Sequence, residues 1–104
     1  MKNIREISKI IRSKNASPFE LTLDIIIKEA DIYDELKKSN WINKKLISEL
    51  YNIPEETIYD IIYFDPCYAI KVTLARNISS GSPGDSDVYG AQQHGPLLSL
   101  ELDI

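Results

Sequence analysis

Residues 19–27 read Phe-Glu-Leu-Thr-Leu-Asp-Ile-Ile-Ile, which is the clearest strand pattern in the chain. Apolar side chains alternate with Glu20, Thr22 and Asp24 before the run becomes wholly apolar, and β-branched residues are frequent. Alternation of this kind turns one row of side chains toward a core and the other row toward the opposite face. We therefore expect a strand whose second face is exposed to solvent or covered by a partner.

Helices are expected on both sides of this strand. Isoleucines at positions 4, 7, 10 and 11 have the spacing of one helical face, which predicts a short helix that stops near Lys14-Asn15, before Pro18. Residues 28–51 have a helical composition that is interrupted at Ser39-Asn40. Two helices joined by a short turn are expected there, with Asn43 as the N-cap of the second.

Three further segments predict strands. Residues 58–64 and 68–75 are rich in β-branched and aromatic residues and are separated by Asp65-Pro66-Cys67, which favours an antiparallel pair. Residues 97–104 alternate again and predict a last strand. Residues 1–104 are then a single α+β domain, a two-layer ferredoxin-like sandwich with a sheet of about four strands and helices on one face. The other face and the sheet edges favour a subunit interface, so a homo-oligomer is one expectation.

Composition narrows the class of protein. The chain has 104 residues, of which 43% are hydrophobic and 27% charged, as in an ordinary soluble domain. A formal charge of −4 argues against nucleic acid as a partner. The single cysteine, Cys67, excludes an internal disulfide and a paired-cysteine zinc site. With no apolar run long enough to span a bilayer and no apolar signal region at the start, we expect no membrane partner and a cytoplasmic location.

All four glycines and the only histidine lie within residues 79–96. A glycine-rich loop can turn sharply, approach a ligand closely and present backbone amides to an anion. Its spacing does not match a phosphate loop, a dinucleotide fingerprint or a calcium loop, and we predict no metal and no cofactor. The alternative is a serine-rich connection whose side chains satisfy its own backbone. Candidate ligand-binding residues are Ser82, Gly84, Asp85, Asp87, Gln92 and Gln93, with His94 as the candidate proton-transfer residue.

The segment Arg12, Ser13, Lys14 and Asn15 is a second candidate. Two cations beside two hydrogen-bonding side chains suit a carboxylate or a phosphate, that is, a small anionic ligand. The alternative is that cations simply favour the C-terminus of the expected helix. We interpret Lys71 as an outward-facing lysine on a wet sheet face rather than as a buried reactive amine.

Three stretches carry a resemblance to a known family. They are Ile11-Arg-Ser-Lys-Asn-Ala-Ser-Pro-Phe-Glu-Leu-Thr-Leu-Asp24, residues 64–73, and Ser80-Gly-Ser-Pro-Gly-Asp-Ser-Asp-Val-Tyr-Gly-Ala-Gln-Gln-His-Gly-Pro-Leu-Leu98. The chain resembles the family called domain of unknown function 4387, whose members accompany proteins similar to the acyclic terpene utilisation protein AtuA. The resemblance implies a ferredoxin-like fold like that at the C-terminus of longer AtuA-like chains. Only Arg12 and Ser13 match the Arg-Ser-Gly-Asp-Lys-Gly turn of those chains.

Three functions remain open on these observations. The first is an accessory or second subunit of a larger AtuA-like protein in organic-acid or acyl-CoA catabolism, which contributes the glycine-rich loop to a shared site. The second is a self-contained enzyme on a small carboxylate or acyl-CoA, in which Arg12 and Lys14 hold the anion and His94 moves a proton. The third is a homo-oligomeric module that binds a small anion.

Overall fold

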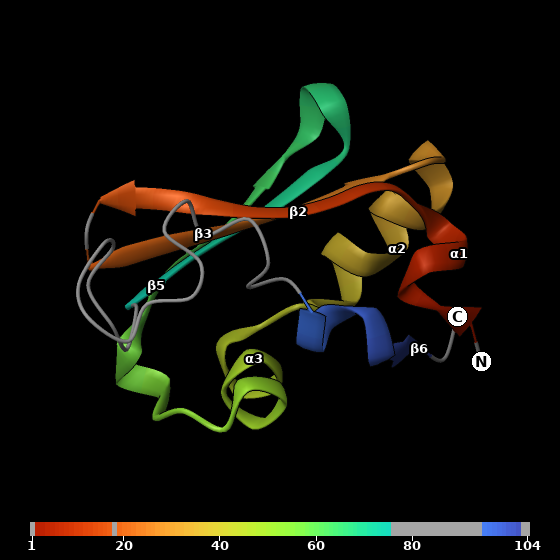
Figure 1. The fold of residues 1–104 in the computed structure, drawn as a ribbon. Coiled ribbons are helices and arrows are strands. Elements are labelled where there is room, and N and C mark those ends of the chain that lie inside the picture. Colours follow the sequence, from red (N-terminus) through yellow and green to blue (C-terminus); the bar gives the residue numbers. More distant parts are fainter. Residues whose placement is uncertain (1, 18, 76–94, 103–104) are drawn as a thin grey trace.

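A four-stranded antiparallel sheet forms one layer of the molecule, with its strands in the order β2-β3-β5-β4 (Figure 1). A computed structural model describes residues 2–17, 19–75 and 95–102 of the chain. The strands are β2 (Ser8–Ser17), β3 (Glu20–Ile27), β4 (Ile58–Phe64) and β5 (Ala69–Ala75). The central pair, β3 and β5, is joined in continuous register from Glu20 opposite Ala75 to Ile26 opposite Ala69.

The second layer lies against one face of this sheet and contains α2 (Ala30–Ser39) and α3 (Lys44–Tyr51) (Figure 1). Short 3₁₀ turns connect the remaining parts: η1 (Glu55–Thr57) before β4, η2 (Asp65–Cys67) between β4 and β5, and η3 (Gly95–Ser99). The expected break between the two helices is confirmed, because Asn40 ends α2 in the left-handed conformation and Asn43 caps α3.

The core fills the space between the two layers. The odd-numbered apolar residues of β3, from Leu21 to Ile27, are buried, as are Ile70, Val72 and Leu74 of β5. Tyr33 and Leu36 of α2 and Ile47 of α3 meet them from the other layer. The alternation of residues 19–27 therefore has the expected consequence: one row of side chains faces the helices and the other faces away.

The N-terminal segment differs from the expectation of a helix over residues 4–11. The helix α1 contains only Ile4–Ile7, and the chain then enters β2, which pairs with β3 over almost its whole length. Ile10 and Ile11 are β-branched and turn to opposite faces of this strand, since Ile10 pairs with Ile26 and Ile11 with Ile25. Arg12 to Asn15 consequently lie within a strand and not at the end of a helix.

The C-terminal segment also differs from the expected strand over residues 97–104. Leu97 and Leu100 are both buried because η3 turns the chain once between them, and the Leu100 amide donates to the Leu97 carbonyl over 3.0 Å. Only β6 (Glu101–Leu102) is extended, and it pairs with β1 (Lys2–Asn3) in a separate two-stranded sheet. Residues 103 and 104 lie outside the described residues.

The two-layer α+β class is confirmed, with a sheet of four strands and helices on one face. The connections place two helices between two hairpins, in the order β2-β3-α2-α3-β4-β5, whereas a ferredoxin-like chain runs β-α-β-β-α-β. Residues 8–17 contribute to this order by forming a strand beside β3, although the isoleucine spacing favours a helix there.

Candidate functional site

The face of the sheet that points away from the helices carries three rows of side chains in cross-strand register, and the third consists of Lys14, Thr22, Thr73 and Asp60. The first row consists of Ile10, Ile26, Ala69 and Phe64, and the second of Arg12, Asp24, Lys71 and Ile62. Within each row, neighbouring residues are direct pairing partners, so their side chains stand side by side. We call this surface the open face, because none of the described helices covers it (Figure 1).

A hollow of about 410 Å³ lies on the open face and takes in most of the first two rows and Lys14 of the third. Its position follows from strand register, since it brings together residues that are distant in the sequence. We call it the open-face pocket, and it is lined by Arg12, Lys14, Asp24, Ile26, Ile62, Phe64, Cys67, Ala69 and Lys71. Three cations and one carboxylate thus share a hollow with four apolar side chains and one thiol.

Arg12 and Asp24 form the ion pair of this pocket. The Nε atom of Arg12 donates a hydrogen bond of 3.1 Å to Oδ2 of Asp24, across the β2–β3 pairing in which the two residues are register partners. The Asp24 side chain is only 13% exposed and that of Arg12 is 55% exposed. Removing a carboxylate from water costs free energy unless it has a charged partner, and the ion pair with Arg12 offsets this cost for Asp24.

Lys14 and Lys71 bring two more positive charges to the pocket. Lys71 stands beside Asp24 on the adjacent strand and is exposed, which confirms the interpretation of Lys71 as an outward-facing lysine. In the described parts of the chain, neither lysine has an ion-pair partner within 4.0 Å. An anion that entered the pocket would meet these two ammonium groups without first breaking an ion pair.

The segment Arg12–Asn15 divides between the two faces of the sheet because it is a strand. Arg12 and Lys14 face the open-face pocket, whereas Ser13 is 6% exposed and lies on the helix-covered side together with Asn15. The other predicted site residues lie outside the described residues: Ser82, Gly84, Asp85, Asp87, Gln92, Gln93 and His94.

Sequence reasoning missed Asp24 and Cys67 as members of the site, together with the apolar residues Ile26, Ile62, Phe64 and Ala69. The signal for Asp24 was present, because it belongs to the polar residues that alternate with apolar ones along this strand and mark the second face of the sheet. No local signal joins Ile62 and Phe64 to Arg12, since that neighbourhood depends on the pairing of β5 with both β3 and β4.

The turn that forms one end of the pocket is tied to α2 by charged hydrogen bonds. The Tyr33 hydroxyl donates to Oδ1 of Asp65 over 2.7 Å, and Nζ of Lys37 donates to the same carboxylate over 2.8 and 3.0 Å. The hydrogen bonds from Lys37 and then from Tyr33 lower the pKa of Asp65. Burial, followed by the bond to Asp65, raises the pKa of Tyr33. These contacts hold η2, which carries Cys67, against the helical layer.

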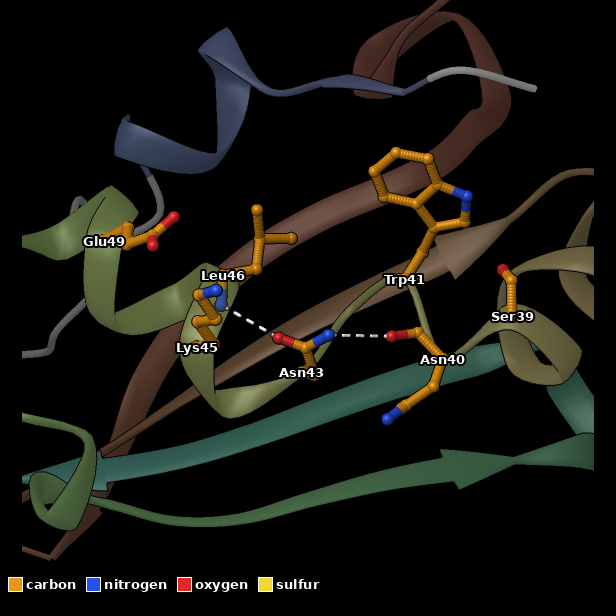
Figure 2. A pocket seen from close by; sticks show the side chains of 7 residues that line it. All are labelled: Ser39, Asn40, Trp41, Asn43, Lys45, Leu46 and Glu49. Carbon is orange, nitrogen blue, oxygen red and sulfur yellow. Dashed lines mark hydrogen bonds between the residues drawn. The ribbon is translucent and has the colours of Figure 1, made fainter.

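A second hollow, of about 480 Å³, lies at the junction of α2 and α3 (Figure 2). Its central polar side chain already has a structural role, because Asn43 accepts a hydrogen bond from the Leu46 amide and donates one to the Asn40 carbonyl, each of 2.9 Å. Trp41 is half-buried and packs against the core. Helix capping accounts for this arrangement, so we take the open-face pocket as the candidate site.

No group of three or more histidine, cysteine, aspartate and glutamate side chains is placed to hold a metal ion in residues 2–17, 19–75 and 95–102. In the same ranges, no helix has the length and apolar character needed to cross a membrane.

The chain matches one family model, described as "Domain of unknown function (DUF4387)", over residues 4–101. No curated protein and no solved structure matches it.

Proposed function

The chain belongs to the family described as domain of unknown function DUF4387, and we propose that it is a small accessory subunit of a larger AtuA-like protein. In this proposal it docks through the open face, works in the cytoplasm in organic-acid or acyl-CoA catabolism, and completes a shared site. One observation carries the proposal. Ile10, Ile62 and Phe64 are large apolar side chains on the same sheet face, and they are 39%, 46% and 54% exposed.

Exposed apolar side chains that gather on one face favour association. Single exposed leucines or isoleucines are common on any protein, but a cluster bordered by charged residues is typical of an interaction surface. Phe64 and Ile62 lie on β4, an edge strand of the sheet, and Ile10 lies on β2, the other edge. A partner that covered the open face would therefore contact both edge strands as well as the two central strands, β3 and β5.

A partner on this face would also change the chemistry of the open-face pocket. Water would be excluded from the hollow, and the charges of Arg12, Lys14 and Lys71 would act across a lower dielectric. Such a chamber between two chains is what a shared site requires. The glycine-rich segment, with His94, is the second contribution that we propose for this chain.

Co-expression with a large AtuA-like protein tests this proposal. We expect the two chains to co-purify and to sediment together. The double substitution Ile62→Ser with Phe64→Ser should weaken the complex at least about tenfold, as truncation of central apolar anchors does. The matched control is Tyr59→Ser, since Tyr59 is 51% exposed on the same strand but does not line the pocket.

Two results would contradict the proposal. The first is a correctly folded monomer with no affinity for the large protein. The second is a stable dimer of the chain alone, detected by light scattering and dissociated by the substitutions at Ile62 and Phe64. That second result would favour the homo-oligomeric anion-binding module.

A further inference from the structure

We propose that the open-face pocket binds an organic carboxylate with a short apolar chain. Lys71 and Lys14, assisted by Arg12, hold the carboxylate, and the apolar row of Ile26, Ala69 and Phe64 holds the chain. This inference rests on the proposed function in taking the open face as the site, and it adds the class of ligand.

The charge of the pocket is opposite to the charge of the protein. Arg12, Lys14 and Lys71 outnumber the one lining carboxylate, Asp24, so the pocket has a formal charge of 3 − 1 = +2, whereas the chain carries −4. A local positive field on an acidic protein attracts small anions and does not suit a polyanion, whose binding needs many more cations.

The cations retain free capacity for hydrogen bonding. Asp24 accepts from Nε of Arg12, but a guanidinium has four further N–H groups, and each ammonium has three. Arg12 and Lys71 flank Asp24 on the two neighbouring strands, so their backbones are about 10 Å apart, or two strand spacings. Long side chains from these positions reach a carboxylate placed above Asp24 and shield it from that residue.

The apolar row indicates that the ligand has an apolar chain in addition to its carboxylate. Ile26 follows Asp24 by two residues along β3, which is about 7 Å in an extended chain. Across the strands, Ile26 pairs with Ala69, and Ala69 pairs with Phe64. A molecule whose carboxylate lies above Arg12, Asp24 and Lys71 therefore has an apolar surface beneath the first carbon atoms of its chain. An inorganic anion would leave this surface uncovered.

The volume of the hollow agrees with a small organic molecule. About 410 Å³ lies near the lower end of the range typical for pockets that bind such molecules. Phe64 and Ile62 at its border are half-exposed in the isolated chain, so we expect modest affinity without a partner, with a Kd on the order of 1 mM.

Titration of the isotopically labelled full-length chain, followed by nuclear magnetic resonance, tests the inference. Hexanoate is the probe, and acetate, inorganic phosphate and hexylamine are compared with it. We expect hexanoate to shift the amide signals of Ile26, Ala69 and Lys71 in a saturable way. It should bind about tenfold more tightly than acetate, because its additional methylene groups leave water. Phosphate and hexylamine should bind more weakly than hexanoate.

Two substitutions separate the contributions of charge and apolar surface. Lys71→Gln should weaken hexanoate about fivefold or more, since one charge-assisted hydrogen bond is lost. Lys38→Gln, at an exposed lysine on α2 outside the pocket, should leave the affinity unchanged. Phe64→Ser should reduce the preference for hexanoate over acetate, with Tyr59→Ser as its control. Unchanged thermal unfolding of each variant shows that the fold is retained.

Three results would overturn the inference: equal affinity for phosphate and hexanoate, equal affinity for hexylamine and hexanoate, or no effect of Lys71→Gln. The assay uses the chain alone, so it is independent of the docking experiment. If the two-chain complex forms but the chain does not bind hexanoate, the inferred ligand class is wrong and the proposed function still stands. If the chain binds hexanoate but forms no complex, the proposed function is wrong and the inferred ligand class still stands.

Discussion

Arg12 and Asp24 face each other across the β2–β3 pair, with Nε of the arginine 3.1 Å from Oδ2 of the aspartate. The two partners are unequally exposed, since water reaches more than half of the Arg12 side chain and little of the Asp24 side chain. The carboxylate therefore depends on the guanidinium more than the reverse.

Arg12→Gln should lower the free energy of unfolding by about 1 kcal/mol, because it leaves a largely buried carboxylate without its charged partner. Asp24→Asn should cost less, since it removes the charge that needs compensation. Lys14→Gln is the control on the same strand face and should change stability by less than about 0.5 kcal/mol. Urea unfolding measures all three variants, and equal losses for Arg12→Gln and Lys14→Gln would contradict the role of the ion pair.

Cys67 provides a chemical test of the pocket, because it is the only cysteine of the chain and lines the hollow. We expect saturating hexanoate to slow the reaction of its thiol with a disulfide reagent about twofold or more, since bound ligand restricts access. Acetate at the same concentration should protect less. Lys71→Gln should abolish the protection, whereas Lys38→Gln should retain it. Equal slowing in the urea-unfolded chain would show that the probe acts on the reagent and not on the pocket.

Tyr33→Phe should lower the free energy of unfolding by about 1 kcal/mol. The substitution removes the 2.7 Å hydrogen bond to Asp65 but retains a buried ring that lies 5.7 Å from Tyr68 and 6.2 Å from Tyr63, centroid to centroid. Tyr59→Phe is the matched control, since Tyr59 is an exposed tyrosine of β4. Equal stability of the two variants would mean that the hydroxyl of Tyr33 contributes nothing.

Asp65 should make stability depend on acid pH. Hydrogen bonds from Lys37 and Tyr33 lower the pKa of Asp65 below its value of 3.8 in the unfolded chain. The ionised carboxylate therefore stabilises the fold above pH 3.8, and this contribution is lost as the pH falls below that value toward the folded-state pKa.

The advantage of the wild type over Asp65→Asn should accordingly be constant near neutral pH and shrink below pH 3.8. Unfolding curves recorded at several pH values measure it. Asp34→Asn is the control, because Asp34 lies on α2 and makes no hydrogen bond to Lys37 or Tyr33. The same pH dependence in both variants would show that overall charge, not the Asp65 contacts, is responsible.

Asn43→Ala should destabilise the chain by about 1 kcal/mol, as is usual for the loss of an N-cap. The variant loses the acceptor for the Leu46 amide and the donor to the Asn40 carbonyl (Figure 2). Asn43→Asp restores the acceptor and should recover most of the stability. Thermal unfolding distinguishes the two, and equal melting temperatures for both variants would contradict a capping role.

Local patterns were sufficient for the elements that keep one periodicity throughout. Alternation along residues 19–27 predicted β3, and the breaks at Asn40 and Asp65 predicted the helix pair and the β4–β5 hairpin. The isoleucines of residues 4–11 have the spacing of a helical face. Ile10 and Ile11 also suit a strand, however, and pairing with β3 favours the strand over the helix.

The candidate site was predictable only in part, because it depends on strand pairing between residues that are distant in the sequence. Residue type singled out Arg12 and Lys14 as candidates for ligand binding, whereas Lys71 was interpreted only as an outward-facing lysine. Their meeting around Asp24 requires residue 12 to pair with 24 and 24 with 71, and such register over long sequence separations has no local signal.

The pairing of β1 with β6 joins the two ends of the described chain, where the amide of Ile4 also donates to the carbonyl of Leu100 over 2.9 Å. During synthesis, Ile4 and Ile7 leave the ribosome long before Leu97, Leu100 and Leu102, which belong to the same buried cluster. The core therefore stays incomplete until translation has passed residue 102. Until then the nascent chain exposes apolar surface, which favours chaperone binding during this interval.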